Sequence, residues 1–432
     1  MNYVSTRGGI APVSLEVAMA AGLAPDGGLY VPQRVPVVEL TRPQATLAQT
    51  AQQVLAPYFA GSDLLGHLPQ LCEAAFDFPA PLRALDGTDD YLLELFHGPT
   101  AAFKDYAARF LAGTLARLRR PADPTTTVLV ATSGDTGAAV AAAFHRRPGF
   151  RVLVLYPDGR VSPRQAHVLG SFGDNVQAMR VDGSFDDCQR LVKQALVDAS
   201  LRERLALTSA NSISLGRLLP QIAYYAHAAL DFHARRGMPL DFIVPTGNLG
   251  NALACWLARR MGLPIGAIVL ACNANDALPR YLDGGDYAPR ATEATLANAM
   301  DVGAPSNFER LRWWHPDDAG LRAGLRAFRV DDAAIRDTIA GAPQRHGVVP
   351  CPHTAVGLRV LERLRAGGDA ADWAVVATAH PAKFEGVVEP LVGHAVEPPA
   401  ALATALAQPA HAQALAADYA ALREHLLRGV DA

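Results

Sequence analysis

The feature that most constrains the fold is an alternation of apolar strands and helices that begins near residue 90. Each apolar run is short and is followed by a helical pattern. Seven runs are predicted strands: Tyr91–Phe96, Thr127–Ala131, Arg151–Tyr156, Val176–Val181, Asp241–Val244, Ala267–Ala271 and Trp373–Ala377. This alternation predicts an α/β fold, with parallel sheet covered by helices on both faces. In such folds, ligands lie beyond the carboxyl ends of the strands.

The segments around this pattern predict the domain organisation. Residues 1–80 hold short helical patterns between turn clusters, which predict a small, mainly helical N-terminal domain. Residues 81–398 form the predicted catalytic core, with a smaller subdomain at about 105–215 and a larger one from the remainder. Residues 273–316 are weakly periodic and predict a loop-rich insertion or lid. The alanine-rich residues 399–432 predict a helical tail.

Composition limits the classes of partner. The chain has 432 residues, of which 50% are hydrophobic and 19% charged, as in ordinary globular proteins. The formal net charge of -3 gives no electrostatic footprint for a nucleic acid or an anionic membrane. The 5 cysteines are scattered without a Cys-x-x-Cys pair, so neither disulfides nor a metal site is expected. Without a signal peptide or a membrane-spanning apolar run, a cytoplasmic location is expected.

Lys104 is the first candidate for chemistry. The apolar run before it is broken by Gly98-Pro99, and Thr100 can cap a helix that carries Lys104 in its first turns. Its flank of that helix is apolar. A lysine in such a setting has a depressed pKa and can attack a carbonyl group to form a Schiff base. The alternative is a lysine that extends its charged end into water.

The scarcity of lysine favours the chemical interpretation. Lysine and arginine total 39, yet lysine occurs only at Lys104, Lys193 and Lys383. Arginine cannot form an imine or transfer a proton at neutral pH, so these three are the candidates for amine chemistry. Lys193 lies on an amphipathic helix and is predicted to be solvated. Lys383 follows the last predicted core strand and remains a weaker candidate.

Two turns have the pattern of anion-binding sites. The first, Ala131 to Gly137, combines small hydroxyl side chains, glycines and the free N–H groups of a helix start, which suit a carboxylate or a cofactor ring oxygen. Its alternative is a plain strand-to-helix turn capped by Asp135. The second, Pro245 to Asn251, has two glycines that let the backbone wrap around a phosphate. A structural turn is the alternative there too, and no dinucleotide or Walker pattern occurs.

Two further polar segments follow the same strand ends. Thr378, in Ala377 to Pro381, offers a hydroxyl that can meet a heterocycle nitrogen. Residues 209–217 are polar and loop-like, leading into a helix that starts near Leu218, and Arg217 with nearby Ser and Asn suits a phosphate dianion. A helix cap with a surface arginine explains this last segment equally well.

Taken together, these segments resemble the threonine synthases of the longer bacterial and fungal type. These belong to the fold-type-II pyridoxal-phosphate enzymes, whose fold is like that of the tryptophan synthase β chain. The matching segments, in the family's order, are Phe96 to Asp105, Ser133 to Gly137, Asn211 to Ser214 with Arg217, Gly247 to Gly250, and Thr378 to Phe384. The resemblance spans nearly the whole chain.

The resemblance implies the cofactor and its ligands. Pyridoxal 5'-phosphate would be held by Lys104 as a Schiff base, with Asp135 near its ring hydroxyl and Thr378 at its pyridine nitrogen. The phosphate would be bound by the loop Gly247, Asn248, Leu249, Gly250 and Asn251. Leu249 and Asn251 stand where phenylalanine and aspartate often occur, and Ala101 where leucine is usual. These departures change the shape of the pocket more than its chemistry.

The resemblance also implies the reaction. Ser133 and Thr136 would take the substrate carboxylate, and Asn211, Ser212 and Arg217 the phosphate of O-phospho-L-homoserine. A β,γ-replacement with water would then give L-threonine and phosphate, as the last step of threonine biosynthesis by a carbon–oxygen lyase that acts on phosphates. A phospho-lyase on the same substrate and a threonine or serine dehydratase are the rivals on this fold. A cofactor-free binding protein is a rival of another class, and a monomer or weak dimer is expected.

Overall fold

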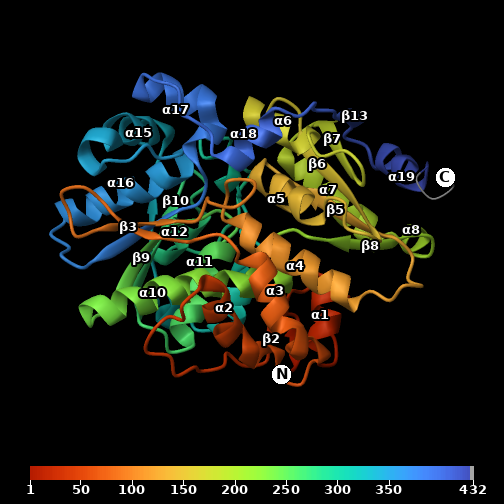
Figure 1. Ribbon diagram of the computed structural model, residues 1–432, viewed down its shortest axis with the longest axis horizontal. Helices are drawn as coiled ribbons and strands as arrows, with labels where there is room; N and C mark the ends of the chain where they lie inside the picture. The colour runs from red at the N-terminus through yellow and green to blue at the C-terminus, as the bar shows by residue number, and fades with distance from the viewer. Residues whose placement is uncertain (429–432) are drawn as a thin grey trace.

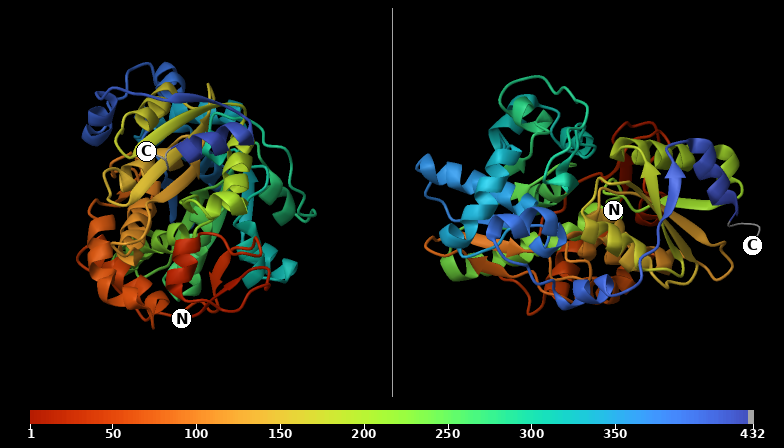
Figure 2. Two further views of the ribbon diagram at one scale, coloured as in Figure 1. Left: turned by 90° about the vertical axis from the view of Figure 1, so that its right-hand side faces the viewer. Right: turned by 90° about the horizontal axis from the view of Figure 1, so that it is seen from above.

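The larger of two parallel sheets has six strands in the order β11-β10-β9-β12-β4-β3. All neighbouring strands are parallel except β3 and β4. The computed structural model describes residues 1–428, and its two sheets lie side by side in separate lobes (Figures 1 and 2). The strands are β3 (Leu82–Ala84), β4 (Tyr91–Glu94), β9 (Leu240–Pro245), β10 (Ile265–Cys272), β11 (Arg326–Arg329) and β12 (Trp373–Ala377).

The smaller sheet has five parallel strands in the order β13-β7-β6-β5-β8. Its last strand in the sequence, β13, comes from the C-terminal segment and pairs with the outer edge of β7. The strands are β5 (Thr126–Ala131), β6 (Phe150–Pro157), β7 (Val176–Asp182), β8 (Ala206–Ser209) and β13 (Gln413–Ala416).

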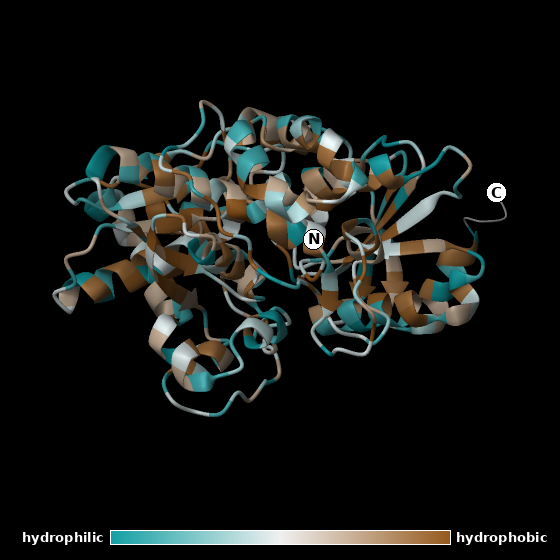
Figure 3. Ribbon diagram, turned by 90° about the horizontal axis from the view of Figure 1, so that it is seen from below, coloured by the Kyte–Doolittle hydropathy of each residue, from teal (hydrophilic) through white to brown (hydrophobic). Residues whose placement is uncertain are grey.

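Both sheets bury apolar side chains on both faces, which is why their strands are nearly continuous apolar runs. In the larger sheet, Phe242 packs in a cluster with α10 (Ile222–Arg236) and α11 (Gly250–Arg260), while its neighbour Ile243 packs with helices of the opposite face. Those helices are α15 (Asp332–His346) and α16 (Pro352–Ala366). Figure 3 shows hydrophobic residues concentrated on the strands.

Helices also cover both faces of the smaller sheet. One face is covered by α4 (Lys104–Leu118), α5 (Asp135–Phe144), α6 (Pro163–Gly170) and α18 (Ala400–Leu406). The other is covered by α7 (Phe185–Val197), α8 (Ala199–Arg202) and α19 (Tyr419–Arg428).

The N-terminal residues form a helical layer beneath both lobes (Figure 1). Helix α2 packs against α10 and helix α3 against α4, so this layer contacts both sheets' covering helices. Thr46 caps α2 by accepting a hydrogen bond from the N–H of Gln49. The elements are β1 (Tyr3–Ser5), α1 (Leu15–Ala21), β2 (Tyr30–Pro32), α2 (Leu47–Leu55), η1 (Ala56–Phe59), η2 (Asp63–His67) and α3 (Leu68–Ala75).

The remaining elements are short and connect the two lobes or cover the larger sheet. They are α9 (Leu215–Leu218), η3 (Leu219–Gln221), α12 (Ala277–Leu282), η4 (Asn298–Met300), α13 (Phe308–Trp314), α14 (Asp318–Gly324), η5 (Pro381–Phe384) and α17 (Glu385–Val392). Within residues 1–428, no helix combines the length and apolar character needed to cross a membrane.

The structure contains every predicted core strand and adds several that the sequence pattern did not predict. Strand β8 lies at the start of the segment predicted to be loop, and the following helix α9 begins at Leu215 rather than near Leu218. The predicted helical tail contains strand β13 between α18 and α19, while residues 429–432 lie outside the described residues. The predicted domain boundaries stay a prediction.

Candidate active site

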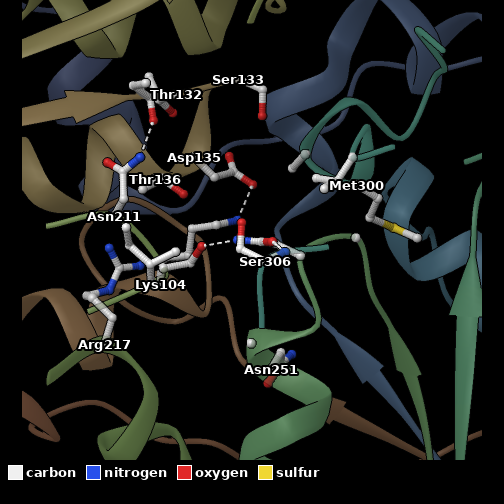
Figure 4. Close-up of a pocket in the computed structure, with 18 of the residues that line it drawn as sticks. Lys104, Thr132, Ser133, Asp135, Thr136, Asn211, Arg217, Asn251, Met300 and Ser306 are labelled. Carbon is white, nitrogen blue, oxygen red and sulfur yellow. Dashed lines mark hydrogen bonds and ion pairs between the residues drawn. The ribbon is translucent and has the colours of Figure 1, made fainter. Parts of the chain in front are cut away.

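A cavity lies at the carboxyl ends of β5 and β9, where the two lobes meet (Figure 4). It is lined by every residue for which the sequence predicted a binding or catalytic role. These are Lys104, Ser133, Asp135, Thr136, Asn211, Ser212, Arg217, Gly247, Asn248, Leu249, Gly250, Asn251 and Thr378. The lining comes from both sheets, as expected when parallel strands place their carboxyl ends toward one region.

Lys104 is held in the cavity by the turn that precedes it. Helix α4 begins at Lys104 itself, and Thr100 does not cap it. Instead, Thr100 donates its N–H and its hydroxyl to the two carboxylate oxygens of Asp105, at 2.8 and 2.5 Å. The N–H of Phe103 donates to the carbonyl of Thr378 at 2.9 Å, which attaches this turn to the end of β12.

The amine of Lys104 is shielded from solvent and lies between an aromatic ring and a carboxylate. Its side chain is 12% exposed, and Nζ lies 4.6 Å from the ring centroid of Phe103 and 3.9 Å from Oδ2 of Asp135. Burial lowers the pKa of Lys104 to about 8; Asp135 opposes this shift, while Lys383 and Arg217 add to it. This direction agrees with the expectation from the apolar flank. About one tenth of the amine is therefore uncharged at pH 7.

Asp135 is the most heavily paired side chain at the site. It is the first residue of α5, where Gly134 occupies the capping position, and its Oδ1 accepts hydrogen bonds from Lys383 Nζ at 2.6 Å and Gln165 Nε2 at 2.9 Å. Burial opposes ionisation, but the charges of Lys383 and Lys104 outweigh it and hold the pKa of Asp135 well below its ordinary value. Asp135 is therefore a fixed negative charge, and it is not a helix cap.

The three lysines differ sharply in their surroundings. Lys383 is 1% exposed, donates to Asp135 and to the carbonyl of Thr100 at 2.7 Å, and is not among the residues that line the cavity. Lys193 is exposed, as predicted, although it stands on the cavity wall. Within the described chain, only Lys104 presents a shielded amine to the cavity.

The turn after β9 offers hydrogen-bond donors without charge. Leu249 adopts a left-handed conformation with φ 63°, and α11 begins at Gly250, so the first N–H groups of that helix have no intrahelical acceptor. Gly247 is required by close packing, because a Cβ atom there would lie 2.7 Å from Cα of Met300. The turn therefore has the local structure of an anion site.

The two asparagines of this turn play different parts. Asn248 is engaged with the protein: its Nδ2 donates to Ser212 Oγ at 2.7 Å and its Oδ1 accepts from the N–H of Ser306 at 2.5 Å. Asn251 accepts on Oδ1 from the hydroxyls of Tyr224 and Tyr225, at 2.7 and 2.9 Å. Its buried Nδ2 has no partner in the part of the chain that the structure describes.

A second free donor of the cavity belongs to Arg217. This side chain is 2% exposed and donates from Nη1 to the carbonyl of Ala210 at 2.6 Å, while its buried Nε has no partner among residues 1–428. Burial lowers the pKa of Arg217 to about 10, which leaves it charged at neutral pH. Asn211 donates to the carbonyl of Ala131 at 3.4 Å, and its Oδ1 is also unpaired within the described residues. Figure 4 shows both side chains beside Lys104.

The sequence did not single out two buried side chains at the site, Gln165 and His353. Nε2 of His353 accepts from the N–H of Ala299 at 3.1 Å, and burial lowers the pKa of the ring to about 4, so it is a neutral imidazole. His353 thereby anchors the segment that packs on Gly247. Each of these residues lies on an ordinary amphipathic helix, and nothing in the local pattern separates it from other helix residues.

The residues of the cavity fit pyridoxal phosphate. They supply one reactive amine, an uncharged phosphate cradle with an orphaned amide donor, a buried hydroxyl-bearing residue at Thr378 and a fixed carboxylate. The family model described as "Pyridoxal-phosphate dependent enzyme" matches residues 79–382. The models "Threonine synthase N terminus" and "Threonine synthase, C-terminal" match residues 2–76 and 354–426. The chain belongs to the threonine synthase family.

Individual threonine synthases are similar in sequence to this chain over nearly their full length. The chain is 39% identical to the threonine synthase of Escherichia coli (strain K12) over 425 residues, which are 96% of each chain. It is 38% identical to that of Haemophilus influenzae over 433 residues, covering 99% of this chain and 100% of the relative.

Solved structures of threonine synthases have the same fold. The crystal structure of the enzyme from Escherichia coli superimposes with a TM-score of 0.92 at 37% identity, covering 99% of this chain and 100% of that one. The structure of PLP-bound threonine synthase from Brucella melitensis gives a TM-score of 0.89 at 35% identity, covering 100% of both chains. The predicted family, α/β fold and pyridoxal-phosphate dependence are therefore confirmed, while the roles of single residues stay predictions.

Proposed function

We propose that this threonine synthase acts on O-phospho-L-homoserine and that its cavity holds two separate phosphate groups, one from the cofactor and one from the substrate. The observation that supports this is that unpaired donors at two places, Asn251 in the turn after β9 and Arg217, line the same cavity as the shielded amine of Lys104. The turn after β9 with Asn251 is uncharged, whereas Arg217 carries a full positive charge at neutral pH. A phosphate dianion on the smaller, exchangeable molecule suits the charged donor.

Pyridoxal phosphate, when bound, supplies the electron sink for the reaction. The free N–H groups at the start of α11 and the Nδ2 of Asn251 would bind its phosphate, and Thr378 and Asp135 would hold its ring. The backbone of Asn248 contributes to this cradle, because its side-chain amide is already engaged with Ser212 and Ser306.

Lys104 has the central part in the proposed chemistry. Because its amine is partly uncharged near pH 7, Lys104 would hold the cofactor. When the substrate amine has taken that place, the freed Lys104 would accept protons from Cα and Cβ of the substrate and would give protons to Cγ and Cα, while water would supply the hydroxyl group at Cβ. Ser133 and Thr136 bind the substrate carboxylate. Arg217, with Asn211 and Ser212, orients the substrate phosphate and retains it after it leaves Cγ. The retained phosphate disfavours the competing reaction, simple elimination.

Borohydride reduction followed by peptide mapping tests the assignment of Lys104. The chain has three lysines, so the map distinguishes Lys104 from Lys193 and Lys383 in one experiment. We expect the cofactor label on Lys104, and threonine and inorganic phosphate released in equal amounts from O-phospho-L-homoserine. Lys104→Arg keeps the charge but cannot form the imine, so turnover should be abolished. Label on another lysine, full activity of that variant, or 2-oxobutyrate as the main product would contradict the proposal.

The state of the cysteines favours a cytoplasmic setting. All 5 cysteines are free and buried, which is typical of a protein that works in a reducing compartment such as the cytoplasm. A monomer or weak dimer stays a prediction, and sedimentation at micromolar concentrations tests it.

A further inference from the structure

Two buried lysines share one carboxylate at this site. Lys104 begins α4, Lys383 lies in η5, and Asp135 begins α5 between them. We propose that Lys383 is a positioning residue: it engages Asp135 so that the carboxylate does not pair closely with Lys104, whose amine thereby stays available as a nucleophile. This inference rests on the proposed role of Lys104 and adds a function for a residue that does not line the cavity.

The distances show which lysine holds the carboxylate. Lys383 Nζ lies 2.6 Å from Asp135 Oδ1, whereas Lys104 Nζ lies 3.9 Å from Oδ2. The first is a charge-assisted hydrogen bond and the second is beyond hydrogen-bond range. Asp135 therefore pairs directly with Lys383 through Oδ1, which also accepts from Gln165, while its Oδ2 faces Lys104 only at longer range.

Lys383 is itself fixed by its surroundings. Its ammonium donates a second hydrogen bond to the carbonyl of Thr100, at 2.7 Å, in the turn that leads into Lys104. Its own carbonyl accepts from the hydroxyl of Ser162 at 2.5 Å. Because it is 1% exposed and doubly paired, Lys383 is not a free amine, and a direct part in imine chemistry is excluded by this geometry.

The ionisable groups around Lys104 come from five elements. Asp135 of α5 and Asp105 of α4 favour its charged form, while Lys383 of η5 and Arg217 of α9 disfavour it. His353 of α16 faces Asp135 as a neutral ring. Without Lys383, the ionised Asp135 would have Lys104 as its remaining lysine partner, and a buried carboxylate with one ammonium neighbour forms a tight ion pair. Lys104 would then be fully protonated near neutral pH.

Competitive acetylation measures the consequence directly. The full-length chain, freed of cofactor, is labelled with isotopic acetic anhydride at a series of pH values, and the peptide that carries Lys104 is quantified; exposed Lys193 is the internal reference. Only the uncharged amine reacts, so the midpoint is the pKa of Lys104. For Lys383→Met we expect that midpoint to rise by about one pH unit or more. Addition of pyridoxal phosphate at pH 7 should then form the Schiff base about tenfold more slowly.

The controls separate charge from structure. Lys383→Arg keeps the positive charge and should keep the midpoint close to that of the wild type. Arg164→Met removes a cation that donates to the carbonyl of Ala382 but does not contact Asp135, so it should not raise the midpoint. If Lys383→Met does not fold, the double variant Lys383→Met/Asp135→Asn leaves no uncompensated carboxylate, and its midpoint should lie at or below that of the wild type.

The outcomes are distinct from those that test the proposed function. An unchanged midpoint in Lys383→Met, a rise in Lys383→Arg as large as in Lys383→Met, or a midpoint of the double variant above the wild type would overturn the role of Lys383. None of these results depends on turnover. If reduction of the wild-type holoenzyme instead places the cofactor away from Lys104, the proposed function fails, whatever the midpoints are.

Discussion

The turn after β5 and the turn after β9 occupy equivalent places at the ends of parallel strands, but they differ in charge. Both lead from the carboxyl end of a parallel strand into a helix that faces the cavity. The first places an ionised carboxylate, Asp135, among buried cations that compensate it. The second carries no charged side chain and leaves amide donors free. The carboxylate of the first turn is thus paired within the protein, whereas we expect the free donors of the second turn to receive an anionic ligand.

The largest expected effect comes from removing the charge of the first turn. Asp135→Asn leaves the ammonium groups of Lys383 and Lys104 facing each other without an acceptor charge, so the free energy of unfolding of the cofactor-free chain should fall by about 3–5 kcal/mol. Urea unfolding at pH 7 measures it. A loss below about 1 kcal/mol would mean that the carboxylate is not needed to hold the two lysines together.

A smaller effect is expected from closing the space in the second turn. Gly247→Ala places a Cβ atom against the backbone of Met300. The backbone must move to relieve this contact, at a free-energy cost of about 1–3 kcal/mol, and the movement misaligns the free N–H groups. The Kd for pyridoxal phosphate should rise about tenfold to a hundredfold, as measured by titration.

Asn248→Ala is the matched control in the same turn. Its amide bonds only Ser212 and Ser306 among the described residues, so its loss should lower stability more than it lowers cofactor affinity. If Asn248→Ala weakens the cofactor more than Gly247→Ala does, side chains rather than the backbone hold the anion, and the contrast between the two turns fails.

The last prediction concerns the contribution of the Lys104 amine itself to the stability of the cofactor-free chain. Burial lowers the pKa of Lys104 from 10.5 to about 8, so between these two values the unfolded chain binds a proton that the folded chain does not. Lys104 therefore costs stability in full below pH 8, and the cost disappears as the pH rises toward 10.5. The cofactor-free Lys104→Met variant should be more stable than the wild type at pH 7, by up to about 3 kcal/mol for a shift of this size. In urea unfolding at several pH values, that gap should shrink as the pH rises; a gap that widens would contradict the depressed pKa.

Much of the fold follows from local pattern, and the exceptions have physical reasons. The buried strands β5, β6 and β9 are apolar on both faces and were predictable. Strand β13, Gln413–Ala416, contains no β-branched or aromatic residue, and it is a strand because the edge of β7 offers it a partner. Strand β8 is short and runs directly into a polar loop, so periodicity could not reveal it.

The candidate site likewise has features that the sequence predicted and features that it did not. Lys104 and the two turns were predictable because each is a local motif at a strand end. The approach of Lys383 to Asp135 was not, because the two residues lie in different lobes of the molecule and meet only when β12 and β5 point their carboxyl ends at one place. His353 and Gln165 contribute through a single nitrogen or amide, and such contacts leave no mark on sequence periodicity.

The pairing of β13 with β7 has a consequence for how the molecule is made. During synthesis, β5, β6 and β7 leave the ribosome long before residues 413–416, so the outer edge of β7 stays open while β9, β10, β11 and β12 of the larger sheet are produced. An open strand edge invites pairing with other chains. We therefore expect the nascent chain to be most vulnerable to aggregation just before its last segment emerges, and a chaperone that shields strand edges to matter most at that moment.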